Sequence, residues 1–128
     1  MITEDYVSFE TANLLKEKGF NEKTHRCYNL CTKEHELSDI DDIALNNWEL
    51  ADDGVSAPTL QMTMKWLREV HKLFIDIFPW DKPNNFLYNI YKIHDTCLEV
   101  VDNEEIFHYN TYEEAAEAVI KHCLENLV

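Results

Sequence analysis

The segment from Ser56 to Ile93 constrains the fold most, because it joins one amphipathic helix directly to two aromatic-rich strands. Pro58 fits only the first turn of a helix, and Ser56 or Thr59 can supply the N-terminal cap. The spacing of the apolar residues predicts that this helix runs to about His71. Its expected buried stripe consists of Leu60, Met64, Leu67 and Val70, widened by Met62 and Trp66.

Two antiparallel strands are predicted after this helix. The first, Leu73 to Phe78, is rich in β-branched and aromatic residues and is stopped by Pro79. After a loop that ends at Asn85, the second strand runs from Phe86 to Ile93. Alternation places Phe86, Tyr88 and Ile90 on one face and Leu87, Tyr91 and Ile93 on the other. Apolar residues on both faces are typical of a central strand.

Another helix is predicted near the beginning of the sequence. Ser8 can cap it, and Gly19 ends it. If Gly19 has a left-handed backbone, Phe20 contacts Leu15 as in a Schellman cap. The apolar residues with helical spacing are Phe9, Ala12 and Leu15, with Leu14 beside them.

The last third of the sequence predicts one more pair of strands and a final helix. Leu98 to Val101 and Ile106 to Tyr109 are expected to pair around a turn at Asp102-Asn103. Thr111 and Glu114 have the spacing of a capping box for the helix. Apolar residues then recur at helical intervals, at Ala115, Val119, Ile120, Cys123, Leu124 and Leu127.

The segment 32–54 is the least regular part of the chain. A short strand is favoured before it, from His25 to Cys31. Within it many Asp and Glu residues accompany a single Lys33, so we expect a mobile acidic loop or a weak helix around Ile40 to Trp48. The order of elements predicts one α+β domain over residues 1–128, with an antiparallel sheet of three to four strands covered by about three helices.

The negative charge of the chain disfavours two classes of partner. The 25 Asp and Glu residues outnumber the 11 Lys and Arg residues, which gives a net charge of −14. Arginine occurs only at Arg26 and Arg68, so we expect no binding to nucleic acid or to an anionic membrane. A basic protein partner is favoured, although surface carboxylates also simply keep proteins soluble.

The sequence also predicts a cellular compartment. Its beginning lacks the pattern of a secretory signal, and no apolar stretch approaches the ~20 residues that cross a bilayer. We therefore expect a cytoplasmic protein whose four cysteines remain reduced.

The sharpest candidate metal site consists of His25, Cys27, Cys31 and His35. Histidine and cysteine are ligands that zinc prefers. If Cys27 and Cys31 lie on one strand, however, they are about 13 Å apart, whereas zinc needs both sulfurs within about 2.3 Å. Only a helical or looped segment would bring the four together, so we predict no bound metal here.

No pattern in the sequence fixes a reaction or a cofactor. Gly19 and Gly54 are the only glycines, so no phosphate-binding loop or dinucleotide-binding glycine motif is present. Glu104 and Glu105 would point to opposite faces of a strand and share no site. A cysteine nucleophile paired with one of the six histidines stays open, but no spacing selects a pair. We expect no cofactor.

The best candidates for partner contact are one tryptophan and several aspartates. Trp80 lies in the loop between the two aromatic-rich strands, and tryptophan combines a large contact area with a polar tip. Its aromatic neighbours Phe78, Phe86 and Tyr88 are expected in the core. The aspartates that would face a basic partner are Asp41, Asp42, Asp52 and Asp53.

Three parts of the sequence resemble a known family. They are Tyr6-Val-Ser-Phe-Glu-Thr-Ala-x-Leu-Leu-Lys-Glu-Lys-Gly-Phe, then Ala57-Pro-Thr with Lys65-Trp-Leu-Arg-Glu-Val-His, and finally Thr111-Tyr-Glu-Glu-Ala with Cys123-Leu-Glu-Asn-Leu. These parts resemble short proteins of unknown function encoded by Bacteroides-type gut bacteria and their phages or prophages. The resemblance implies a mobile-element context and brings no activity, substrate or catalytic residue.

Three classes of function follow from these observations. The leading hypothesis is a small non-enzymatic accessory domain, of phage or prophage type, that works through protein contacts. The second is an acidic inhibitor or nucleic-acid mimic, in which carboxylates of Glu34 to Asp53 and Glu99 to Glu117 imitate phosphates toward a basic protein. The third is a small enzyme that uses a cysteine or a metal. The oligomeric state stays open, although a sheet edge near Leu98 to Tyr109 could pair across a dimer.

Overall fold

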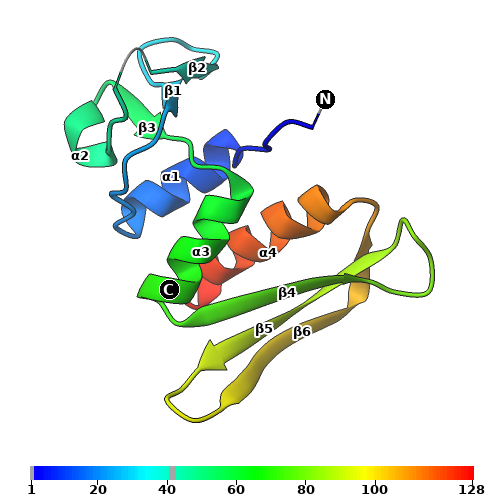
Figure 1. The fold of residues 1–128 in the computed structure, drawn as a ribbon. Coiled ribbons are helices and arrows are strands. Elements are labelled where there is room, and N and C mark those ends of the chain that lie inside the picture. Colours follow the sequence, from blue (N-terminus) through cyan, green and yellow to red (C-terminus); the bar gives the residue numbers. More distant parts are fainter. Residues whose placement is uncertain (1, 41–42) are drawn as a thin grey trace. The chain divides into compact units, whose positions relative to one another are not determined.

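The order of elements along the chain is α1-β1-β2-α2-β3-α3-β4-β5-β6-α4, and the described strands form two three-stranded antiparallel sheets (Figure 1). The computed structural model describes residues 2–40 and 43–128, and from 102 to 107 it describes the backbone only. This architecture confirms the predicted α+β class. Contacts within the chain group the residues into two compact units. The first contains the residues up to Thr59 together with Leu124–Val128, and the second contains Leu60–Cys123.

The first unit is built from α1 (Phe9–Glu17), the short helix α2 (Asn47–Leu50) and a small sheet. Strand β1 confirms the short strand predicted between His25 and Cys31, whereas β2 was missed. For Ile40 to Trp48 the sequence predicts a mobile loop or a weak helix, and among the described residues of this range only Asn47 and Trp48 are helical, as part of α2. The sheet has the order β2-β1-β3, with β1 at Arg26–Asn29, β2 at Leu37–Asp39 and β3 at Gly54–Ser56.

Both ends of α1 have the predicted caps. The Ser8 hydroxyl accepts a hydrogen bond from the Thr11 N–H at 3.2 Å. Gly19 has a φ of 89°, and the Phe20 N–H donates to the Leu15 carbonyl at 2.9 Å. This is the backbone geometry of the Schellman motif, and it places the Phe20 side chain in the core.

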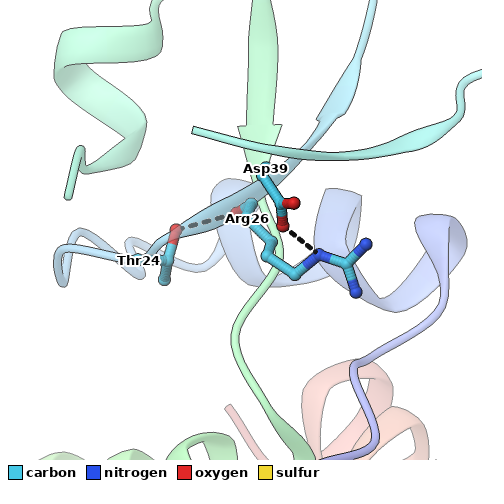
Figure 2. Close-up of polar contacts among 3 residues, drawn as sticks. All are labelled: Thr24, Arg26 and Asp39. Atoms are coloured by element: carbon cyan, nitrogen blue, oxygen red, sulfur yellow. Dashed lines mark hydrogen bonds and ion pairs between the residues drawn. The ribbon is translucent and has the colours of Figure 1, made fainter. Parts of the chain in front are cut away.

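A polar cluster joins β1 to β2. Arg26 and Asp39 lie opposite each other in the register, and the Arg26 Nε is 3.0 Å from the Asp39 Oδ1 (Figure 2). The contact is an ion pair and not an aligned hydrogen bond. The guanidinium also lies over the Tyr6 ring, 4.8 Å from its centroid. The Thr24 hydroxyl donates to the Arg26 carbonyl at 3.0 Å. Because Asp39 is largely exposed, this ion pair contributes at most about 1 kcal/mol.

Asn47 is a buried polar residue that connects three parts of the first unit. Its Nδ2 donates to the Phe20 carbonyl at 2.8 Å, just after α1. Its Oδ1 accepts from the Ser56 N–H at 2.8 Å, in β3. Its own position at the start of α2 is fixed by a capping box between Asn46 and Glu49.

The second unit places two helices against a sheet of order β4-β5-β6. β5 lies between the other two strands, as the sequence predicts for a strand with two apolar faces. The elements are α3 (Leu60–Val70), β4 (Leu73–Pro79), β5 (Phe86–Ile93), β6 (Leu98–Tyr109) and α4 (Tyr112–Asn126). The residues of α4 up to Cys123 belong to this unit.

Figure 1 shows α3 and α4 on the same side of this sheet. The Phe86 ring of β5 meets the Tyr112 ring of α4 edge to face, with 6.4 Å between the centroids. The Gln61 side chain of α3 donates to the Tyr112 hydroxyl at 3.3 Å. Tyr88 and Ile90 lie on the same face of β5 as Phe86 and are buried, so this face forms the core of the unit.

The start of α4 follows its predicted capping box in part. The Glu114 N–H donates to the Thr111 hydroxyl at 3.1 Å. The Glu114 carboxylate accepts from the Asn110 N–H at 3.2 Å, one residue before the expected position. The predicted apolar stripe is buried at Ala115, Val119, Ile120, Cys123 and Leu124, whereas Leu127 is 37% exposed.

Two sequence predictions for the second unit are wrong. The hairpin around Asp102-Asn103 is in fact one continuous strand, β6, because both residues pair with β5 instead of forming a turn. Val70, expected in the buried stripe of α3, is 55% exposed. It is the last residue of α3, and the chain turns away at Lys72, whose φ is 57°.

His71 is expected to make the stability of the second unit depend on pH. Its ring packs edge to face on Trp66 at 4.6 Å, and its Nε2 is buried without a hydrogen-bond partner. Burial, with the Lys92 charge as the second cause, lowers the pKa of His71. Below about pH 6.5 the unfolded chain therefore binds a proton that the folded chain does not. We expect the free energy of unfolding to fall between about pH 7.5 and about pH 5.5, measured by urea titration.

Two variants assign this pH dependence to His71. His71→Gln should show a smaller decrease over the same pH range, because the titrating group is gone. Lys92→Gln should reduce the decrease only in part, since the lysine is the second cause of the pKa shift. Equal slopes for the wild type and His71→Gln would contradict the assignment.

Candidate protein-contact surface

The sheet of the second unit has one face that α3 and α4 do not cover (Figure 1). Phe74, Tyr91 and Val100 lie opposite one another across β4, β5 and β6, so their side chains share a face. Ile90, next to Tyr91 in the strand, points the other way into the core. The outer sheet face defined by this register consists of Phe74, Asp76, Phe78, Leu87, Asn89, Tyr91, Ile93, Leu98 and Val100.

One end of the outer sheet face is apolar and open to solvent. Phe74 is 37% exposed, Val100 57% and Leu98 58%. The Phe74 and Tyr91 rings lie 6.3 Å apart and tilted by 49°. Isolated exposed apolar residues are normal on a protein surface, whereas apolar side chains that adjoin across three strands form a candidate binding surface.

Trp80 extends the opposite end of this face. The centroids of the Trp80 and Phe78 rings lie 6.5 Å apart, and the ring planes form an angle of 78°. Trp80 is 57% exposed. Leu87, opposite Phe78, is 8% exposed. The Trp80 N–H donates to the Asn85 carbonyl at 2.7 Å, and the Asn85 side chain returns a hydrogen bond to the Trp80 carbonyl at 2.9 Å. These two bonds hold the loop that presents the indole.

The middle of the outer sheet face is polar. Asp76 of β4 lies opposite Asn89 of β5. Asp76 carries the only charge among the β4 and β5 positions of this face. On β4 and β5 the surface therefore combines apolar ends with one central carboxylate.

The predicted contact residues do not form one site. Trp80 belongs to the second unit, whereas Asp52 and Asp53 lie exposed in the first, directly before β3. The Asp53 carbonyl accepts a hydrogen bond from the Leu30 N–H at 3.0 Å, so its backbone has a structural role. Asp41 and Asp42 lie outside the described residues.

The four metal-ligand candidates are also distributed over different surroundings. Cys27 lies on β1, and burial raises the pKa of its thiol, which makes the thiol less reactive. Cys31 is exposed beyond the strand, with its Sγ 3.8 Å from the Asp53 Oδ1. His35 has a φ of 48° and stacks on Phe9 at 4.2 Å. The described residues, which include His25, contain no group of three or more His, Cys, Asp or Glu side chains that could hold a metal.

Sequence reasoning found Trp80 but missed Phe74, Leu98 and Val100 as surface residues. A signal was present, because apolar residues occupy both faces of the first two strands of this sheet. With helices on one side only, one of the two apolar faces has to be open. The sequence alone does not indicate which of the two faces is open.

Comparisons with known proteins identify no relative: no protein-family model, no curated protein and no solved structure matches this chain. In the part of the chain that the structure describes, every helix is too short or too polar to cross a bilayer.

Proposed function

We propose that this protein is a small non-enzymatic accessory domain, of phage or prophage type, that binds a protein partner in the cytoplasm. The observation that carries the proposal is the outer sheet face, where Phe74, Tyr91 and Val100 adjoin across three strands and face solvent. Trp80 adds a rigid aromatic side chain of the kind that contributes strongly to interfaces. An exposed apolar surface of this kind is stabilised when a partner covers it.

The acidic-mimic hypothesis remains a second proposal, on a different surface. Glu34, Glu36, Asp52 and Asp53 are all exposed in the first unit. Binding through these carboxylates would weaken steeply with salt, since the Debye length shrinks from about 10 Å at 0.1 M to about 3 Å at 1 M. Binding through the apolar end of the outer sheet face would persist. Salt dependence therefore separates the two proposals.

To test the proposal, the protein is used as bait to capture partners from an extract of the source cells. The extract is treated with nuclease, and the capture is done at two salt concentrations. The bait variant Phe74→Ser/Val100→Ser removes the apolar end of the outer sheet face while leaving the core intact. The matched control is Trp48→Ser, which removes an 81% exposed tryptophan from the first unit. We expect a partner that the wild type and Trp48→Ser retain and that the double variant loses at least about tenfold. Equal capture by all three baits would contradict the proposed surface.

A further inference from the structure

We infer that β4 accepts an extended segment of a basic protein as an additional strand, an inference that rests on the proposed function and specifies its partner. β4 is an edge strand in the order β4-β5-β6, and among the described strands it pairs with β5 alone. Edge strands carry a row of backbone groups that another chain can pair with.

Two backbone hydrogen bonds show which groups of β4 are free. At one end the Ile93 N–H donates to the Lys72 carbonyl at 2.8 Å, and at the other the Trp80 N–H donates to the Asn85 carbonyl at 2.7 Å. Both pairs continue the register of β4 and β5. Hydrogen-bonded and non-hydrogen-bonded pairs alternate in an antiparallel ladder. Phe74, Asp76 and Phe78 therefore bond to β5, and the N–H and C=O groups of Leu73, Ile75 and Ile77 point to the other side of β4. Leu73 is 2% exposed, so the groups that an added strand can reach are those of Ile75 and Ile77.

This edge has few of the features that normally prevent pairing. β4 contains no lysine, its register with β5 shows no bulge, and its one proline, Pro79, is the last residue of the strand. The opposite edge, β6, is less regular, because its register with β5 shifts at two places. β4 is thus the straighter template for an added strand.

The side chains of β4 define the chemistry of the added strand. On the outer sheet face, Asp76 lies between Phe74 and Phe78. A matching strand places a lysine or arginine opposite Asp76 and apolar residues two positions to either side. The net charge of −14 favours the approach of a basic segment. A second copy of this chain fits poorly, because pairing the centres of two β4 strands would bring two Asp76 carboxylates together.

The experiment uses the full chain and a synthetic peptide, Arg-Thr-Val-Thr-Lys-Thr-Val-Thr-Arg, with both ends blocked. Amide hydrogen exchange is followed by NMR with and without the peptide. We expect the peptide to slow exchange of the Ile75 and Ile77 amides by at least about tenfold, because these N–H groups gain acceptors. The Phe74, Asp76 and Phe78 amides, already bonded to β5, should change much less.

Two control peptides separate strand addition from charge attraction. In one, the two threonines beside the lysine are replaced by proline, which keeps the charge but cannot pair along an edge. In the other, glutamate replaces the lysine and both arginines. We expect neither control to slow exchange of the Ile75 and Ile77 amides.

Two variants of the protein test the named residues. Ile75→Pro removes an N–H at the free edge without removing a bond to β5, and it should weaken peptide binding at least about tenfold. Asp76→Asn removes the charge opposite the lysine and should weaken binding about threefold. If Ile75→Pro does not fold, the exchange measurement on the wild type still decides the question.

The outcomes distinguish this inference from the proposed function. Failure of the peptide to bind, or binding without slower exchange at Ile75 and Ile77, overturns strand addition at β4. The proposed function then still depends on capture by Phe74→Ser/Val100→Ser. Equal slowing by the glutamate peptide overturns the choice of a basic partner.

Discussion

Replacing Ile90 with alanine is expected to lower the free energy of unfolding by about 3 to 4 kcal/mol, the largest effect we predict for a single substitution. Ile90 is fully buried, at 0% exposed, in the central strand of the second unit. Truncation removes three carbon atoms from contact with the core and leaves a cavity that a central strand cannot easily collapse. Urea unfolding of the variant and the wild type measures the difference.

The matched control for Ile90 is Ile93→Ala, the same substitution on the other face of the same strand. Ile93 lies on the outer sheet face and is only half-buried. Its truncation should cost about 1 kcal/mol. Similar losses for the two variants would mean that both faces of β5 are covered, which would contradict the open face on which the proposed function depends.

Asn47→Leu is the second substitution with a large expected effect, about 3 kcal/mol of destabilisation. Leucine has nearly the shape of asparagine but makes no hydrogen bonds. The Phe20 carbonyl and the Ser56 N–H would each lose their 2.8 Å partner inside the first unit. Each buried polar group left without a partner costs about 1 to 3 kcal/mol. Thermal and urea unfolding followed by circular dichroism would measure the loss.

Asn84→Leu is the control for this asparagine substitution. Asn84 is exposed in the loop between β4 and β5, so the change should alter stability by no more than about 0.5 kcal/mol. A loss for Asn47→Leu no greater than that of the control would show that the two bonds contribute little to the fold.

The sequence predicts well those elements that depend on local signals. Ser8 and Gly19 fix the ends of α1 through hydrogen bonds within five residues, and Thr111 begins α4 in the same way. The strands β4 and β5 follow from residue type and alternation. In each case the pattern and the structure that it specifies lie in the same short stretch of chain.

Elements that depend on distant pairing are not predictable in this way. The three residues of β2 are a strand because they pair with β1, about ten positions earlier in the chain. Asp102 and Asn103 favour a turn by themselves, but pairing with β5 holds them in an extended strand. Asn46 and Glu49 have the spacing of a capping box. Because the surrounding acidic segment lacks apolar periodicity, this spacing alone does not predict α2.

The candidate surface was only partly predictable for a related reason. Trp80 is recognisable because it lies in a loop, where a large aromatic side chain has few core neighbours. Phe74 and Tyr91 are typical core residues by type. Only the arrangement of α3 and α4 on one side of the sheet shows that their face is open.

The division of the chain into units has a consequence for how the protein folds during synthesis. The second unit is continuous in sequence, whereas the first combines the residues up to Thr59 with Leu124–Val128. Leu124 is fully buried, and the Lys18 side chain donates to the Val128 carbonyl at 3.0 Å. Because the ribosome makes Leu60–Cys123 before Leu124–Val128, the first unit can complete its native contacts only after every residue of the second unit has been synthesised.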